Sequence, residues 1–279
     1  MDPRPSPLAG RWYPAHPEAL QASVEALLAA APPVTPPTPG CAVVGLLAPH
    51  AGHAYSGAVA AHAFRAVQGQ AYELVVIAGP SHFHADGPLL TSGHSHYATP
   101  LGSVPVDQAA LAALQAALAA TGRELTPLRH DHEHALEIEL PFLQRALAPG
   151  FALLPLMLRD QSPTQAQALG AALAQVLAGR RALLVASSDL SHFYPQATAN
   201  AMDAVMLDAV AAGDPAGLLA AQAEGRGQAC GVGALAAGLW AAQALGATQM
   251  TVAAHATSGD VTGDYAEVVG YGAAVFWKC

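Results

Sequence analysis

Three short apolar runs in this chain each end in a loop that presents a histidine. The runs are Ala42–Gly57 (AVVGLLAPHAGHAYSG), Glu73–His82 (ELVVIAGPSH) and Ala182–His192 (ALLVASSDLSH). Continuous Val, Ile and Leu bounded by turn residues are typical of strands buried on both faces, as in a parallel sheet covered by helices. Ligands bind beyond the carboxyl ends of such strands. We therefore expect His50, His82 and His192 to meet at one edge of a single sheet.

Helical periodicity fills most of the chain between these runs. It predicts helices over 17–30, from an N-cap at Ser56 to 66, from a cap at Asp107 to 120, and over 163–178, 196–212 and 215–224. A further buried helix should follow His134 and tolerate or bend at Pro141. Apolar runs predict strands over 151–158, 250–254 and 268–276, the last two flanking a loop at 258–260.

The order of these elements indicates one α/β domain. The composition does not shift on a domain scale, and no internal repeat occurs beyond the strand-and-histidine pattern. Residues 1–40 should form an irregular arm, a helix and a stiff proline-rich linker that leads into the first strand. We expect a single domain over residues 1–279 with a parallel sheet between helices.

Composition and charge narrow the possible partners. The chain is 53% hydrophobic and 11% charged, which excludes a disordered chain. Its net charge is -9, and Lys278 is its single lysine, so it has no basic stripe for a phosphate backbone. We therefore expect no nucleic-acid partner.

The start of the chain and its cysteines predict the compartment. The opening residues show neither the apolar region of a signal peptide nor a transit-peptide pattern, so we expect a cytoplasmic protein. The uncharged stretch 229–247 is Ala- and Gly-rich and lacks basic or aromatic flanks, which favours a buried core helix over a membrane span. Cys41, Cys230 and Cys279 are odd in number and widely spaced, so we expect no disulfide framework and a reducing compartment.

Cys230 and His192 are the strongest further candidates for chemistry. Cys230 precedes a long apolar helix, whose N-terminus would stabilise a thiolate; a metal ligand is the preferred interpretation, and a small buried hydrophobe the alternative. Asp189 could orient His192 as an acid/base catalyst. A Ser-His-Asp hydrolase would lack the G-x-S-x-G elbow and leave the other histidines unexplained.

Two further groups admit a functional and a structural interpretation. Asp131 and His134 could orient a ligand, or could be a helix cap and a surface histidine. Trp12 could line a pocket, but its position in an N-terminal arm favours a role in pinning that arm to the core.

Seven ordered motifs resemble one known family. They are GRWYP from Gly10, APHAGHAYSG from Ala48, GPSH from Gly79, YATPLG from Tyr97, DHEHALEIELPF from Asp131, SSDLSH from Ser187 and CG at Cys230. They cover essentially the whole chain and resemble the Memo family, whose prokaryotic members are called AmmeMemoRadiSam system protein B. The resemblance implies a three-layer α/β domain with a mostly parallel central sheet, similar to the class III extradiol dioxygenases.

The resemblance also implies roles for individual residues. It implies His50, His82 and Cys230 as metal ligands, His192 with Asp189 and His134 as catalytic residues, and Trp12, Tyr55, His53 and Asp131 as substrate-binding residues. His53 departs from the aromatic residue expected at its position, which affects the substrate preference rather than the metal.

The implied activity is a non-haem-iron, oxygen-using oxidoreductase. Iron(II) is the first expectation, with copper or zinc possible, because a thiolate replaces the carboxylate that completes the dioxygenase iron site. The substrate would be a small aromatic molecule or a peptide, and the family name implies functional partners in an AMMECR and radical SAM system. The alternative is a non-catalytic metal- or peptide-binding protein of dioxygenase ancestry.

Overall fold

A nine-stranded sheet forms the centre of the molecule. The computed structural model describes residues 1–279. Four parallel strands occupy the middle of the sheet, in the spatial order β2 (Ala42–Ala48), β9 (Ala182–Ser187), β3 (Leu74–Pro80) and β8 (Ala152–Leu158). The three apolar runs are therefore neighbouring parallel strands, as the sequence predicts.

Other strands extend this parallel core on both sides and make the whole sheet mixed. On one side, β12 (Val268–Lys278) pairs with β2, and both β11 (Gln249–Thr257) and β10 (His192–Tyr194) pair with β12. All three pairings are antiparallel. Beside β8 lie β4 (Leu89–Ser92), which is antiparallel to it, and β7 (Thr126–Leu128). A separate small sheet joins β1 (Pro3–Arg4), β5 (His96–Thr99) and β6 (Gly102–Pro105).

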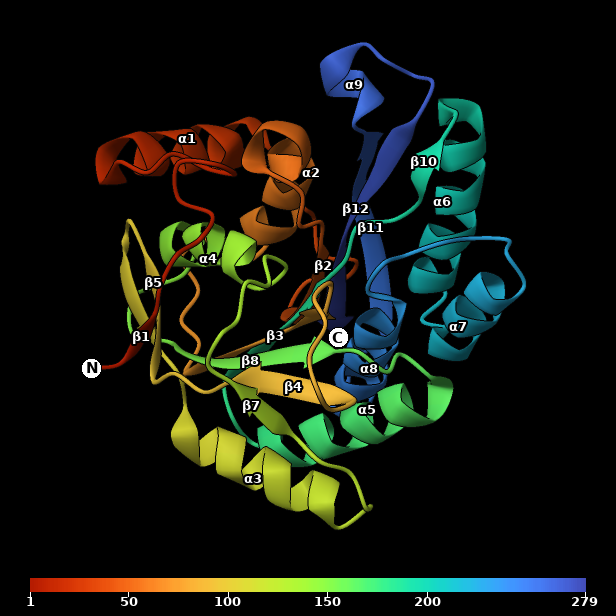
Figure 1. The fold of residues 1–279 in the computed structure, drawn as a ribbon. Helices are drawn as coiled ribbons and strands as arrows, with labels where there is room; N and C mark the ends of the chain where they lie inside the picture. Colours follow the sequence, from red (N-terminus) through yellow and green to blue (C-terminus); the bar gives the residue numbers. More distant parts are fainter.

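Helices cover both faces of the sheet, which gives three layers (Figure 1). One face carries α1 (Pro17–Ala30), α2 (His53–Arg65) and α4 (Leu140–Ala146), the last preceded by the short helix η1 (Glu137–Glu139). The other carries α3 (Gln108–Ala119), α5 (Pro163–Leu177), α6 (Gln196–Ala211), α7 (Pro215–Ala223) and α8 (Val232–Ala244). A short helix, α9 (Gly259–Thr262), follows β11.

Side-chain alternation along the central strands explains why both faces are covered. In β3, Val75 and Ile77 point into the core under α1 and α2, whereas Leu74, Val76 and Ala78 point into the core over α5 and α8. All five are buried. Because successive strand residues face opposite sides, a continuous apolar run can be stable only between two helical layers.

Two predicted helix starts had different outcomes. Asp107 caps α3, because its carboxylate accepts a hydrogen bond from the Ala110 backbone N at 2.9 Å. The predicted cap at Ser56 is wrong: α2 begins at His53 after Gly52, and the Ser56 hydroxyl donates to the Ala51 carbonyl at 3.0 Å. Pro141 lies in the first turn of α4, where it needs no hydrogen-bond donor, so it does not bend the helix.

The expectation that the cysteines form no disulfide is wrong for one pair. Cys41 and Cys279 are linked, with their Cα atoms 4.1 Å apart. Strands β2 and β12 pair antiparallel, and their ends place Ala42 opposite Lys278, so the residues just beyond are cross-strand neighbours. Sequence spacing could not reveal this contact between residues at opposite ends of the chain. Cys230 is the one free cysteine.

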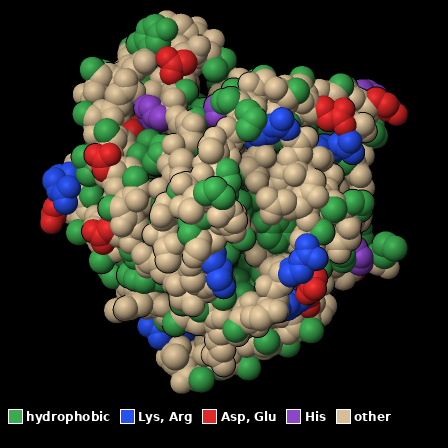
Figure 2. All heavy atoms as spheres, turned by 180° about the vertical axis from the view of Figure 1, so that it is seen from behind, with side chains coloured by type: hydrophobic (Ala, Val, Ile, Leu, Met, Phe, Trp, Pro, Cys, Tyr) green, Lys and Arg blue, Asp and Glu red, His purple; other side chains and the backbone are tan.

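The stretch 229–247 contains α8, which is buried against the sheet as predicted. None of the helices combines the length and apolar character needed to cross a membrane. On the face shown in Figure 2, lysine and arginine side chains are scattered between acidic and neutral groups rather than gathered in a stripe.

Candidate metal centre

Loops at the carboxyl ends of the parallel strands bring the predicted histidines together. His50 follows β2, His82 follows β3 and His192 follows the loop after β9. All three line one cavity of about 440 Å³. The predicted meeting of the three strand ends is confirmed, since β2, β9 and β3 are adjacent in the sheet.

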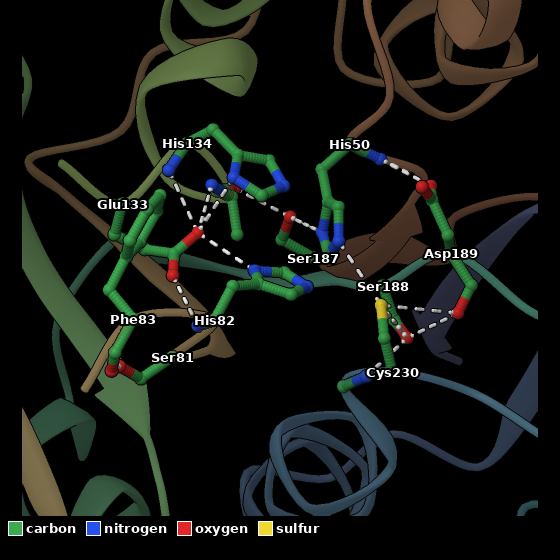
Figure 3. Close-up of polar contacts among 12 residues, drawn as sticks. His50, Ser81, His82, Phe83, Glu133, His134, Ser187, Ser188, Asp189 and Cys230 are labelled. Carbon is green, nitrogen blue, oxygen red and sulfur yellow. Dashed lines mark hydrogen bonds and ion pairs between the residues drawn. The ribbon is translucent and has the colours of Figure 1, made fainter.

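Three imidazoles line this cavity, and the thiol of Cys230 lies beside one of them (Figure 3). The ligand atoms of His50, His82 and His134 all lie within 4.8 Å of one another. The Cys230 Sγ lies 3.1 Å from the His50 Nε2. Imidazole and thiolate are ligands of iron, copper and zinc, and this spacing is compatible with donors around one ion. The residues present therefore fit the metal that the sequence resemblance implies.

Glu133 orients His82. Its carboxylate accepts a hydrogen bond from the His82 Nδ1 at 2.9 Å and another from the His82 backbone N at 2.5 Å. Burial by itself would raise the pKa of Glu133, but the hydrogen bond and charge of His82 and the charge of His134 lower it to about 2. An ionised carboxylate can only accept, so the His82 Nδ1 carries the hydrogen and its Nε2 is the nitrogen left for a metal.

A second buried chain of hydrogen bonds orients His50. Its Nδ1 lies 2.9 Å from the Ser187 Oγ, which also contacts the Ala135 carbonyl at 2.6 Å and the Glu139 carboxyl at 2.9 Å. Burial raises the pKa of Glu139 well above its ordinary value, which favours its neutral form. The Ser187 hydroxyl has one hydrogen, which it can donate to the Ala135 carbonyl. Its oxygen then accepts hydrogen bonds from a neutral Glu139 and from the His50 Nδ1–H. The His50 Nε2 is then free to face Cys230.

Cys230 lies immediately before α8, packed closely against the loop that follows β9. Its backbone N donates to the Asp189 carbonyl at 3.1 Å. A Cβ on the next residue, Gly231, would lie 2.7 Å from the Ser187 carbonyl oxygen, so only glycine permits this approach. Burial, followed by the nearby Asp189, raises the pKa of the Cys230 thiol. In the metal-free protein, burial therefore favours the neutral thiol.

Asp189 does not orient His192, contrary to expectation. The Asp189 carboxylate accepts a hydrogen bond from the His50 backbone N at 2.7 Å. The His192 Nδ1 instead donates to the Leu190 carbonyl at 2.8 Å, and its backbone N donates to Gln228 at 3.0 Å. Both Asp189 and His192 nevertheless line the cavity. Burial raises the pKa of Asp189 to about 7 and lowers that of His192.

His134, Trp12 and Tyr55 form another part of the cavity wall. The His134 ring stacks on His82 with the ring centres 4.4 Å apart, and Trp12 packs on His134 at 4.5 Å. Burial lowers the pKa of His134 to about 4. Tyr55 also lines the cavity and is 47% exposed. Trp12 therefore lines the cavity as well as belonging to the N-terminal arm, so the structural interpretation of this residue was incomplete.

Two residues expected to bind substrate do not line this cavity. His53 is buried behind it, between Tyr13 and Phe142, and its Nε2 contacts the Ile138 carbonyl at 3.1 Å. Burial lowers its pKa to about 4, so the neutral ring acts as a core residue. Asp131 pairs with the buried Arg4 at 2.7 Å and borders a separate cavity. Sequence motifs show which residues are adjacent in the chain but not the direction of a side chain, so they do not distinguish these two residues from those that line the cavity.

The structure also reveals supporting residues that sequence reasoning did not single out. They are Glu133, Ser187, Glu139 and the buried pair Arg4 and Glu137. Glu133 and Glu137 lie within the motif that starts at Asp131, and Ser187 starts the motif around His192. The motifs were therefore the available signal, but nothing in them indicated which acidic or hydroxyl group reaches which histidine.

Comparison with known proteins supports the resemblance over almost the entire length. The family model for Memo-like proteins matches residues 4–275. A MEMO1 family protein of Methanopyrus kandleri is 35% identical over 277 residues, which cover 96% of this chain and 97% of the relative. MEMO1 family proteins of Nitrosopumilus maritimus and Thermotoga neapolitana are 37% and 38% identical, covering 84% and 83% of this chain and 84% and 82% of those relatives. The chain therefore belongs to the Memo family.

Proposed function

We propose that the protein is a metal-dependent, oxygen-using oxidoreductase whose metal is held by His50, His82 and Cys230. The observation that carries the proposal is the cluster of imidazole nitrogens within 4.8 Å, with a thiol 3.1 Å from the His50 Nε2. Hydrogen bonds occupy the Nδ1 atoms of His50 and His82, which leaves their Nε2 atoms for the ion. Such fixed imidazoles are typical of metal ligands.

Iron(II) is the metal that we propose, with copper and then zinc as alternatives. Three protein ligands leave a coordination position open, as catalytic sites require. When bound, iron would supply electron transfer to oxygen and would polarise the substrate. The cavity in front of the histidines has room for a small aromatic molecule or the side chain of a peptide.

His134 defines a second possible ligand set. Its ligand atom belongs to the cluster within 4.8 Å, whereas Cys230 is not part of that cluster. We favour Cys230 because its Sγ faces the free nitrogen of His50 and because His134 lies against Trp12 in the cavity wall. In this arrangement, His134 would contact the substrate and could donate a hydrogen bond to it.

His192 and Asp189 are the proposed proton carriers. The His192 Nδ1 is fixed by the Leu190 carbonyl, which leaves its Nε2 as the base that can take a proton from a substrate hydroxyl. Asp189 shares the cavity, and its pKa of about 7 suits a group that gains and loses a proton near neutral pH. The two would act as separate groups, since Asp189 bonds to the His50 backbone rather than to His192.

Metal analysis of variants tests the ligand set. We expect Cys230→Ser and His50→Ala to lose most of the iron bound after anaerobic loading, whereas His134→Ala and the exposed control His16→Ala should retain it. Elemental analysis of each desalted protein gives the result. Retention by Cys230→Ser together with loss by His134→Ala would replace the proposed set with three histidines.

Oxygen uptake tests the reaction. Iron-loaded protein should consume oxygen when a catechol or an indole-containing peptide is added, and His192→Ala should reduce the rate about 100-fold or more without loss of iron. An electrode records the uptake. Absence of uptake with every such compound, while iron remains bound, would favour a protein that binds metal or peptide without turnover.

A further inference from the structure

Arg11 is a cation without a partner at the mouth of the metal-site cavity. Arg11 and Arg65 are the two arginines whose side chains make no hydrogen bond or ion pair within the chain; the others are held by carboxylates or carbonyls. Arg65 lies in the last turn of α2, whereas Arg11 lines the cavity that contains His50 and His82. Arg11 is exposed, so its guanidinium is free to meet a ligand.

The backbone fixes where Arg11 emerges. Its N donates to the Leu8 carbonyl at 2.9 Å in a tight turn, and the preceding Gly10 has a φ of 78°, which favours glycine. The next residue, Trp12, accepts a hydrogen bond from the His53 backbone N at 2.9 Å, which ties the turn to the start of α2. The guanidinium is therefore carried on an ordered turn beside the aromatic wall.

No carboxyl of the cavity pairs with Arg11. Asp189 is the only carboxyl that lines the cavity, and this group already accepts a hydrogen bond from the His50 backbone N. The rest of the wall includes the aromatic rings of Trp12, Tyr55 and Tyr271. The cavity thus combines apolar, planar surfaces with one permanent positive charge at its opening.

We propose that Arg11 selects substrates that are aromatic carboxylates, binding the carboxylate at the mouth while the ring lies against Trp12 and Tyr55. A guanidinium matches a carboxylate with two parallel N–H donors, so it distinguishes an acid from its neutral amide of the same size. The role of this binding in a reaction rests on the proposed function, but the recognition itself does not require a metal.

The test compares phenylacetate with phenylacetamide in metal-free protein, so that a bound ion cannot attract the carboxylate. Protein treated with a chelator and then desalted is titrated with each compound, and ligand-observed NMR gives the dissociation constants. We expect the acid to bind about tenfold more tightly than the amide. The difference should disappear in Arg11→Gln and persist in Arg65→Gln, which removes the other unpaired arginine away from the cavity.

Three results would overturn the proposal. They are equal or undetectable binding of the two compounds by the wild type, an unchanged preference in Arg11→Gln, and a preference that appears only after metal loading. The last would assign the carboxylate to the metal instead of Arg11. A protein that prefers the acid but never consumes oxygen would retain this proposal and contradict the oxidoreductase, so the two failures are distinguishable.

Discussion

Glu133 contacts two histidines of the site through one carboxylate oxygen. Its Oε1 lies 2.9 Å from the His82 Nδ1 and 3.2 Å from the His134 Nδ1, and the side chain is 2% exposed. The same carboxylate accepts the backbone N–H groups of His82, His134 and Ala135. One buried acid therefore fixes both the ring direction and the backbone of this half of the cluster.

The first prediction follows from the number of donors around Glu133. Glu133→Gln should weaken iron binding about 10–100-fold, because the amide NH₂ group would face an N–H group that needs an acceptor. Competition with a chromogenic chelator measures the affinity. Glu124→Gln, which removes an exposed acid elsewhere, is the control and should change nothing. A loss of less than twofold in Glu133→Gln would contradict the assigned role.

Glu139 differs from Glu133, because its surroundings favour the neutral acid. It is fully buried, its one protein partner is Ser187, and its Oε2 has no hydrogen-bond partner. Its pKa lies well above the ordinary value of 4.5, so the folded protein holds a proton that the unfolded chain releases as the pH rises. Stability from this group is complete below 4.5 and is lost as the pH rises through the folded pKa.

The second prediction uses this sign. Glu139→Gln keeps the size and a donor for Ser187, so its free energy of unfolding should match or exceed that of the wild type, with the advantage growing as the pH rises above 4.5. Glu139→Ala should lose about 1–3 kcal/mol below pH 4.5, because it leaves a cavity and removes a buried partner, and this loss should shrink as the pH rises. Urea denaturation across the pH range measures both. An advantage of Glu139→Gln that shrinks with rising pH would show that Glu139 is ionised.

At the scale of elements, the N-terminal arm is part of the site's support. Arg4 in β1 is 1% exposed and binds Asp131 at 2.7 Å, Glu137 at 2.5 Å and the Glu133 carbonyl at 2.5 Å. Tyr13, at the other end of the arm, donates to Glu137 at 2.7 Å. The arm thus holds the segment that carries Glu133 and His134, although it is distant from that segment in sequence.

The third prediction is that Arg4→Met destabilises the protein by about 3–5 kcal/mol, because it leaves Asp131 and Glu137 buried without a cation. Arg129→Met removes the other arginine that ties the arm, an exposed residue paired with Asp2, and should cost less than about 1 kcal/mol. Chemical denaturation gives both values. Equal losses would mean that the buried network contributes no more than a surface pair.

At the scale of the whole molecule, the disulfide joins the start of β2 to the end of the chain. The linked cysteines are 238 residues apart in sequence, so the bond encloses nearly the whole fold. A closure of this kind restricts the unfolded chain and usually stabilises a protein. It also leaves Cys230 as the single thiol, next to His50.

The fourth prediction concerns these thiols. Alkylation of the unfolded, unreduced protein should label only Cys230, and prior reduction should expose Cys41 and Cys279 as well, as mass spectrometry would show. The double variant Cys41→Ala/Cys279→Ala should lose about 2–4 kcal/mol of unfolding free energy relative to the oxidised protein. Labelling of all three cysteines without reductant would contradict the link.

The sequence by itself determined the parallel core, most helices and the meeting of His50, His82 and His192. These follow from local patterns: apolar runs form strands buried on both faces, and the ends of adjacent parallel strands share one sheet edge. The family was also evident from seven ordered motifs. The direction of side chains was not evident from the sequence. For that reason the sequence wrongly suggested that His53 and Asp131 face the cavity, and it did not indicate the supporting roles of Glu133 and Glu139.

Only the tertiary structure decided the long-range pairs. Cys41 meets Cys279, Arg4 meets Asp131, and Asp189 bonds to His50 instead of His192, because strand order and register bring together residues that no spacing in the sequence relates. The tertiary structure likewise raises the pKa of the Cys230 thiol, because packing removes much of it from water. Packing determines desolvation and the direction of side chains, and both depend on the whole fold.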